Sequence, residues 1–178
     1  MPKVFSPEEI NQLRSFVAET RYRVAFELLV RPGLRVEELL RLRVGDVDVA
    51  RRRIRVSGEW ERDVSISGAF VFFLRTELKN RLSGEYLIPG KKGKSIGQKT
   101  ITRFLSNTGK RLGLKNVSAR NLRTTAIVRR IGAGDAQAEV LRQFGIQDHE
   151  KTWRRYRDLA GSELKRGAGQ GEKNRLDF

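Results

Sequence analysis

The sequence predicts a mainly α-helical domain with a small antiparallel β-sheet, an α+β fold. Apolar residues recur at helical spacing along most of the chain. Two short segments, residues 53–57 and 63–67, alternate instead, and the few residues between them predict a β-hairpin. The 178 residues suffice for one domain with a core, and neither a repeat nor a linker divides them.

The helix boundaries are predicted from capping residues and from glycine and proline. Ser6 is suited to cap the first helix, because Pro7 and two acidic residues follow it. Pro32-Gly33 ends the second helix, and the third begins near Leu34. The helices are expected near residues 6–17, 21–30, 34–42, 69–81, 97–112, 119–131, 136–144 and 149–159. The glycines expected to end later helices are Gly113, Gly132 and Gly145.

Residues 1–166 are expected to form the folded domain. Residues 167–178 are rich in glycine and polar side chains, which predicts a flexible basic and polar tail. Residues 84–89 predict a short extended piece, and residues 89–94 a basic loop.

The composition indicates a polyanionic partner. Lys and Arg number 37 against 21 Asp and Glu, a formal net charge of +16, and 26 of the basic residues are arginines, which fork onto phosphate. The absence of cysteine excludes disulfides and thiol catalysis, and a single histidine argues against a zinc site. No metal or cofactor is expected. Neither a signal peptide nor a run of roughly 18 apolar residues is present, which predicts an intracellular protein without a membrane partner.

Three arginines and a tyrosine, Arg35, Arg120, Arg123 and Tyr156, form the candidate site. Arg35 follows a Pro-Gly break and opens a helix, while Arg120 and Arg123 lie one helical turn apart. Tyrosine can attack a phosphate when cations stabilise its anion, since a phenol ordinarily has a pKa near ~10. Each part alone has an ordinary alternative: a surface ion pair of Arg35 with Glu38, a basic stripe on DNA, or a core tyrosine.

The ordered set resembles the catalytic domain of the tyrosine recombinases, or phage integrases. The Gly-Leu-Arg-x-x-Glu-Leu-Leu-x-Leu stretch around Arg35 resembles the first arginine motif of that family. The Arg-x-Leu-Arg at 120–123 resembles its His-x-Leu-Arg box, with Arg in the His position, at which archaeal and archaeal-virus members vary. The Phe-Gly at 144–145 resembles the Leu-Gly before the family's second His or Trp, and Tyr156 falls where the family has its nucleophile. The match covers residues 5–164.

The resemblance implies site-specific DNA recombination or integration, in which a strand is cut and rejoined through a 3′-phosphotyrosyl intermediate without a metal. It assigns the nucleophile to Tyr156 and phosphate binding to Arg35 and Arg123, supplemented by Arg120. Glu38 is expected to support Arg35 through an i,i+3 contact. A type IB topoisomerase shares the chemistry, but those enzymes wrap DNA with further domains that this sequence lacks.

Two positions depart from the family pattern. Glu59 stands where the hairpin carries the catalytic lysine, the general acid for the leaving 5′-oxygen, and Ile146 stands at the second histidine position. His149, the only histidine, is a candidate for the site, with a surface position as its alternative. General acid catalysis is typically worth ~10²–10⁴-fold, so a slow enzyme is expected. The alternative is a catalytically impaired DNA-binding homologue of the same fold.

Double-stranded DNA is the expected partner. The chain is expected to be a monomer without DNA and a tetramer on it, with residues 159–164 passing between neighbours. The family's N-terminal core-binding domain is expected to be absent. The basic side chains expected to contact DNA are Arg62, Lys91, Lys92, Lys94, Lys99 and Arg103.

Overall fold

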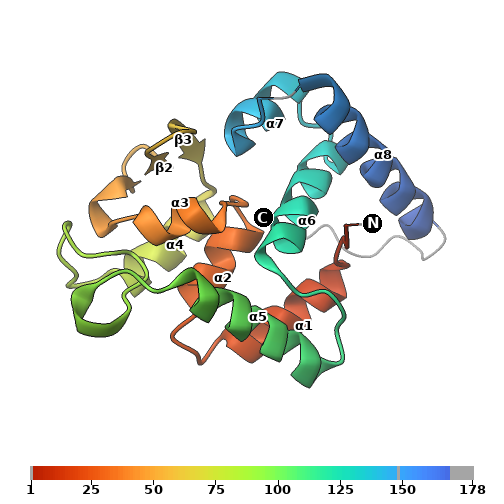
Figure 1. Ribbon diagram of the computed structural model, residues 1–178. Helices are drawn as coiled ribbons and strands as arrows, with labels where there is room; N and C mark the ends of the chain where they lie inside the picture. The colour runs from red at the N-terminus through yellow and green to blue at the C-terminus, as the bar shows by residue number, and fades with distance from the viewer. Residues whose placement is uncertain (1, 148, 169–178) are drawn as a thin grey trace.

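The computed structural model describes residues 2–147 and 149–168, with the backbone alone at residues 149 and 166–168. The described residues form eight α-helices and one small sheet, which confirms the predicted class (Figure 1). The helices are α1 (Pro7–Val17), α2 (Arg23–Val30), α3 (Val36–Arg41), α4 (Gly68–Glu77), α5 (Gln98–Leu112), α6 (Ala119–Gly132), α7 (Gln137–Phe144) and α8 (His149–Ala168). Two 3₁₀ turns are η1 (Val44–Asp46) and η2 (Lys91–Gly93).

The sheet contains the predicted hairpin and one further strand. The strands are β1 (Val47–Asp48), β2 (Arg53–Val56) and β3 (Arg62–Ser65). They pair antiparallel in the order β1-β2-β3, with Ile54 opposite Val64. Both of these side chains are buried, and the alternation predicted this face of the hairpin. The sequence did not predict β1, because two residues are too few to show a period.

Capping residues account for several of the helix ends. The hydroxyl of Ser6, as predicted, and that of Ser118 accept backbone N–H bonds at the starts of α1 and α6. Gly113 and Gly145 end α5 and α7 in the left-handed conformation. Gly132 does not take this role: it is the last residue of α6, and the left-handed glycine is Gly134, with φ +89°.

Two further helix ends differ from the prediction. Helix α4 stops at Glu77, four residues early, where Asn80 adopts a positive φ of 66°. Helix α8 continues to Ala168 and includes the first two residues of the segment predicted as a tail. Residues 169–178 lie outside the described part of the chain.

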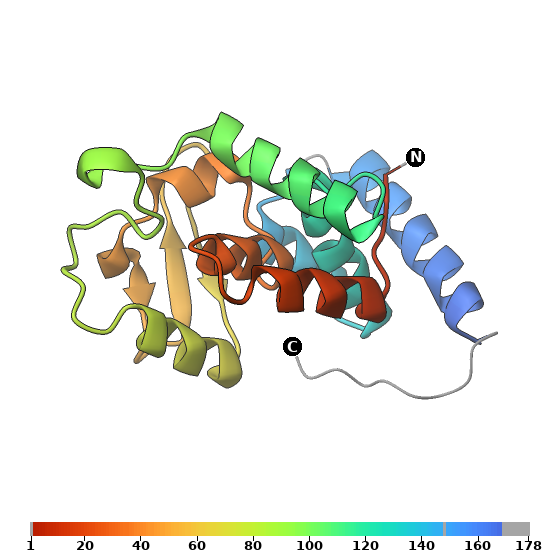
Figure 2. The same ribbon diagram turned by 90° about the horizontal axis from the view of Figure 1, so that it is seen from below.

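Helix α6 is the central element of the packing, because α2, α7 and α8 all contact it (Figure 1). Its first half supplies Leu122 to the main core, and its second half supplies Ile127 to a smaller cluster with α7 and α8. Viewed from below, α1 and α5 lie side by side, and the sheet with α4 lies at one end of the molecule (Figure 2). None of the described helices has the length and apolar character needed to cross a bilayer.

Gly33 lies where the loop before α3 packs closely against the end of α7. Its φ of +63° is left-handed, and an added Cβ would lie 2.5 Å from Phe144 Cε1 and 3.1 Å from Ala126 Cβ. Gly33→Ala should therefore lower the free energy of unfolding by about 1–3 kcal/mol from overpacking, in addition to the backbone cost. Denaturant unfolding of the variant measures this loss.

Gly113→Ala is the matched control for this substitution. Gly113 has a similar φ of +68°, but nothing lies within 4 Å of an added Cβ. The difference between the two variants isolates the overlap with Phe144. Equal losses in both variants would contradict the close packing.

Candidate active site

The loop between α2 and α3 presents Arg35 at the start of α3. Arg35 is the N-cap residue with extended backbone, and its N–H donates to Glu38 Oε2 at 2.8 Å. Its Nη1 donates to Glu38 Oε1 at 2.8 Å, the i,i+3 contact predicted from the sequence. The Glu38 carboxylate thus accepts bonds from both the backbone and the guanidinium of Arg35, so it caps the helix and fixes that side chain.

Arg123 lies in the second turn of α6 and is held by two backbone carbonyls. Its Nη1 donates to Gly33 O, and its Nη2 donates to Phe144 O. Its guanidinium also lies 5.5 Å from the centre of the Phe144 ring. A guanidinium has five N–H groups, so these two bonds leave three for a ligand.

The pKa of Arg123 reports its surroundings. Burial is the main cause that lowers this pKa to about 10, and the charge of Arg35 lowers it further. The charges of Glu38 and of ionised Tyr156 oppose this effect. Arg123 therefore stays protonated at neutral pH.

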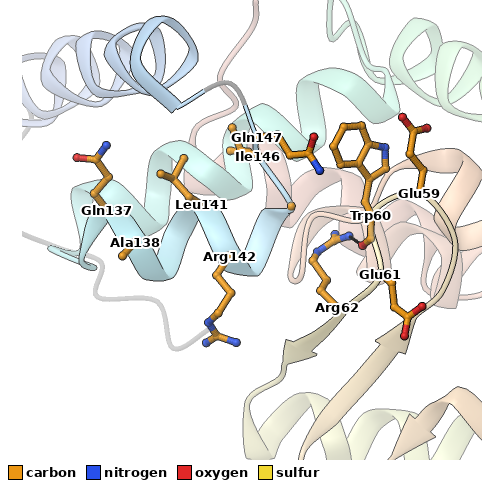
Figure 3. Close-up of a pocket in the computed structure, with 11 residues that line it drawn as sticks. Glu59, Trp60, Glu61, Arg62, Gln137, Ala138, Leu141, Arg142, Ile146 and Gln147 are labelled. Atoms are coloured by element: carbon orange, nitrogen blue, oxygen red, sulfur yellow. Dashed lines mark hydrogen bonds between the residues drawn. The ribbon is translucent and has the colours of Figure 1, made fainter.

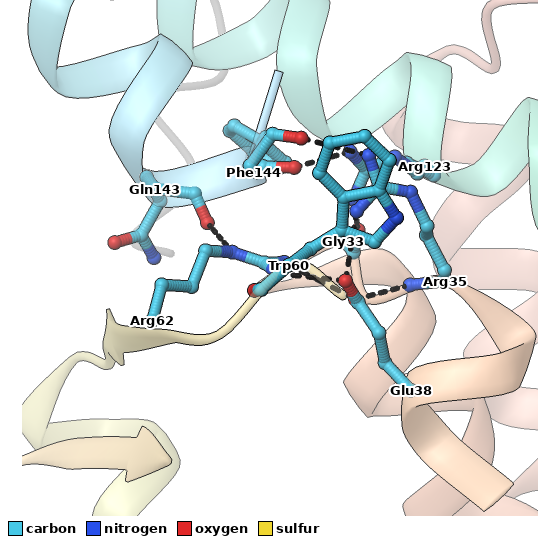
Figure 4. Close-up of polar contacts among 9 residues, drawn as sticks. Gly33, Arg35, Glu38, Trp60, Arg62, Arg123, Gln143 and Phe144 are labelled. Carbon is cyan, nitrogen blue, oxygen red and sulfur yellow. Dashed lines mark hydrogen bonds and ion pairs between the residues drawn. The ribbon is translucent and has the colours of Figure 1, made fainter. Parts of the chain in front are cut away.

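The C-terminus of α7 binds three arginines in a row. Gln143 O accepts from Arg62, Phe144 O accepts from Arg123, and Gly145 O accepts from Arg35. The last carbonyls of a helix lack partners within the helix and carry partial negative charge, so guanidinium groups are favoured there. Figure 4 shows these arginines converging from three separate segments on the end of α7.

Arg62, which the sequence predicted to contact DNA, has a largely buried side chain. Its side chain is only 7% exposed, and its Nη1 pairs with Glu38 Oε1 at 2.7 Å. Its Nη2 donates to Glu38 Oε2, its Nε to Gln143 O, and its Nη1 also to Trp60 O. The alternating pattern of β3 gave no sign of this burial, because the partners lie far away in the sequence.

Glu38 is buried between two arginines. Burial opposes its ionisation, but hydrogen bonds from Arg62 and from the Arg35 backbone outweigh this effect and hold its pKa below the ordinary value of 4.5. The carboxylate is therefore ionised at neutral pH. It compensates part of the positive charge that three arginines concentrate here.

Trp60 and Gln143 also belong to the site, and the sequence did not point to either. The Trp60 ring lies 4.8 Å from the Arg35 guanidinium, within the range of a cation–π contact. The buried Gln143 amide bonds both the N–H and the carbonyl of Ser65 and so joins α7 to β3. Neither contact has a sequence signal, since the partners share no periodic spacing.

Tyr156 lies in the middle of α8, on the face that packs against α6. Its side chain is 8% exposed and belongs to the smaller apolar cluster with Ile127, Val140 and Phe144. Arg155 lies 5.0 Å from the centre of its ring. The packing of α8 on α6 therefore places Tyr156 in one cluster with Phe144, whose carbonyl binds Arg123.

The remaining positions of interest are Arg120, His149, Glu59 and Ile146. Arg120 is exposed one turn before Arg123, and it makes no hydrogen bond or ion pair with the described residues. The His149 side chain lies outside the described part of the chain. Glu59 is exposed in the hairpin loop, and Ile146 packs against the smaller cluster.

The other basic residues predicted to contact DNA are all exposed. Three of them lie in or beside η2 and two lie on α5. They are Lys91, Lys92, Lys94, Lys99 and Arg103. Their contact with DNA stays a prediction.

A groove of about 710 Å³ opens beside the arginines, between the hairpin loop and α7. Glu59, Trp60 and Glu61 form one wall, and residues of α7 such as Leu141 and Arg142 form the other. Figure 3 shows the two walls facing each other, with Arg62 at the base of the loop. The groove gives one edge of the site access to solvent.

Comparison with known proteins gives consistent matches. The profile of the phage integrase family matches residues 3–163. Tyrosine recombinase XerC of Corynebacterium efficiens is 30% identical over 132 residues, which are 71% of this chain and 43% of the relative. Tyrosine recombinase XerA of Pyrococcus horikoshii is 29% identical over 130 residues, 69% of this chain and 45% of the relative. The chain thus spans about half the length of the curated relatives it matches.

Solved structures show the same fold. The crystal structure of XerA recombinase superposes with a TM-score of 0.78 at 24% identity, covering 97% of this chain and 65% of that one. XerH recombinase bound to its difH substrate in a post-cleavage complex gives a TM-score of 0.74 at 17% identity, covering 95% and 53%. At these identities the superpositions establish the fold of the chain.

Proposed function

The chain belongs to the phage integrase family, and from this we propose that it cuts and rejoins double-stranded DNA through a covalent link to Tyr156. The observation that carries the proposal is the convergence of Arg35, Arg123 and Tyr156. Both guanidinium groups are fixed by protein carbonyls and retain N–H groups for a phosphate. The relatives named tyrosine recombinases support the same reaction class.

In the proposed reaction, Arg35 and Arg123 bind the non-bridging oxygens of the scissile phosphate. They stabilise the negative charge that develops in the pentacoordinate transition state. Tyr156 Oη attacks the phosphorus, its proton leaves to solvent, and the bond to the 5′-oxygen breaks. The products are a 3′-phosphotyrosyl link and a 5′-hydroxyl. A 5′-hydroxyl from another strand reverses the step, so the bond energy is kept and no nucleotide cofactor is consumed.

The leaving 5′-oxygen needs a proton, and the exposed Glu59 at the lysine position does not readily supply it. Water, His149 or a lysine of the 91–94 loop is the proposed donor.

Arg120, one turn from Arg123, is proposed to orient the phosphate. The exposed lysines and Arg103 are proposed to contact the DNA backbone, and copies of the chain are proposed to assemble as tetramers on DNA and to separate without it.

A trapping experiment tests the proposal. Duplexes with a randomised core and a nick a few nucleotides 3′ of the cleaved position release a short fragment that carries the 5′-hydroxyl, and its loss prevents rejoining. The chain should form an adduct that survives denaturing electrophoresis, in EDTA as well as without it. Peptide mapping should place the DNA on Tyr156.

The position of Glu59 favours a second function, a DNA-binding homologue that no longer cuts. Under that function the same duplexes would be bound, with steep salt dependence, but would yield no adduct. Introduction of a lysine by Glu59→Lys should accelerate trapping by ~10²–10⁴-fold if the chain is a slow enzyme. If both the unmodified chain and Glu59→Lys bind the duplexes but form no adduct, the proposed cleavage activity is refuted.

A further inference from the structure

The three carbonyls at the end of α7 bind arginines that have different roles. Arg35 and Arg123, on Gly145 O and Phe144 O, are the proposed phosphate ligands. Arg62, on Gln143 O, is buried, and its other bonds go to Glu38 and to Trp60 O. The C-terminus of α7, which binds both proposed phosphate ligands, is thus itself bound by Arg62 from the hairpin.

The bonds of Arg62 connect this element to the other support of Arg35. Its Nη1 and Nη2 bind the two oxygens of Glu38 at 2.7 and 3.1 Å. The same carboxylate binds Arg35 Nη1 at 2.8 Å. Its Nε binds the end of α7 at 2.9 Å. Arg62 therefore sets the distance between Glu38 and the α7 carbonyls, the two partners between which Arg35 is held.

A buried arginine is costly unless its charge and hydrogen bonds are satisfied. Here they are satisfied by Glu38 and by the carbonyls of Gln143 and Trp60. Trp60, whose carbonyl Arg62 binds, also places its ring near Arg35. The planar fork of Arg is required to reach these partners at once, because a lysine has a single nitrogen.

We propose that Arg62 is a positioning residue, which holds Arg35 and Arg123 in register for one phosphate through Glu38 and the C-terminus of α7. This inference rests on the proposed function, since it concerns the same phosphate. It assigns Arg62 no contact with the DNA. A displacement of about 1 Å at reacting groups can cost ~10²-fold in rate, so a support of this kind affects the rate strongly.

The test compares Arg62→Met and Arg62→Lys with the unmodified chain. The trapping rate at saturating DNA and the DNA affinity are measured separately. In DNA-free protein, the Nε–H NMR signals of Arg35 and Arg123 report the surroundings of the two guanidinium groups. The signals are assigned by their loss in Arg35→Lys and in Arg123→Lys. Both Arg62 variants should trap DNA about 10–100-fold more slowly at nearly unchanged affinity, with both NMR signals shifted.

Arg81→Met is the matched control. Arg81 also pairs with a glutamate, Glu85, and donates to two backbone carbonyls, Tyr86 O and Leu87 O, but it lies outside the site. This variant should lose stability while its trapping rate and the two NMR signals stay unchanged. It separates a general loss of stability from a loss of positioning.

The outcomes decide between the readings. Unchanged trapping and NMR signals in Arg62→Met would make Arg62 a structural brace only and overturn the inference. A full rate in Arg62→Lys would overturn the requirement for the fork, and this conservative variant also serves if Arg62→Met does not fold. If the unmodified chain forms no adduct, the proposed function fails, while the NMR signals still decide whether Arg62 sets the two arginines.

Discussion

Replacement of Tyr156 by Phe should abolish the covalent DNA adduct while leaving DNA binding intact. The substitution removes one hydroxyl, and the ring that packs between α6, α7 and α8 remains. The free energy of unfolding should therefore change by no more than about 1 kcal/mol. A phenylalanine ring offers no atom that can attack phosphorus, so trapping should fall to background.

The chain provides its own controls for this substitution. Its only other tyrosines are Tyr22 and Tyr86, both partly exposed and both in contact with an arginine. Tyr86→Phe and Tyr22→Phe should trap DNA at the unmodified rate. An adduct that persists in Tyr156→Phe would show that another residue is the nucleophile and would refute the proposed role.

Replacement of Glu38 by Gln should lower the free energy of unfolding by about 3–5 kcal/mol, because it leaves a buried guanidinium without its charge partner. The side chains of Glu38 and Arg62 are 5% and 7% exposed, so water does not replace the lost charge. Adduct formation should also fall, because Arg35 loses its partner. Denaturant unfolding at pH 7 measures the first effect and trapping the second.

Glu37→Gln is the control, since Glu37 is exposed in the same turn of α3. It removes the same charge from the chain and should change the free energy of unfolding by no more than about 0.5 kcal/mol. A similar loss in both variants would mean that net charge, not the buried pair, is responsible.

The pH dependence of the Glu38 effect has a defined sign. The folded chain holds the pKa of Glu38 below 4.5, its ordinary value, so the folded state binds fewer protons than the unfolded state near that pH. The contribution of Glu38 to stability is therefore complete above about pH 4.5 and is lost as the pH falls through the folded pKa. The difference between the unmodified chain and Glu38→Gln should shrink on acidification below pH 4.5.

The parts of the fold that the sequence predicted are those set by local chemistry. Ser6 and Ser118 cap helices because their hydroxyls reach nearby N–H groups, and the alternation around Ile54 and Val64 identifies the buried face of the hairpin. The contact of Arg35 with Glu38 follows from helical spacing. The two-residue β1 and the early end of α4 have no comparable local signal.

The part of the site that could not be predicted depends on tertiary contacts. The burial of Arg62 requires Glu38 and Gln143, which come from separate elements. A chain with 37 basic residues gives no means of choosing which of them turn inward. The stacking of Trp60 on Arg35 is equally hidden, because it depends on where the loop folds back.

The packing of α8 on α6 has a consequence for assemblies of unequal copies. It places Tyr156 in one cluster with Phe144, whose carbonyl binds Arg123 of the same polypeptide, so every copy contains both the proposed attacking group and the proposed phosphate ligands. If active and Tyr156→Phe chains assemble together, each active copy should cut independently of its neighbours. The yield of cut strands should then rise in direct proportion to the active fraction, whereas a shared site would give a curved dependence.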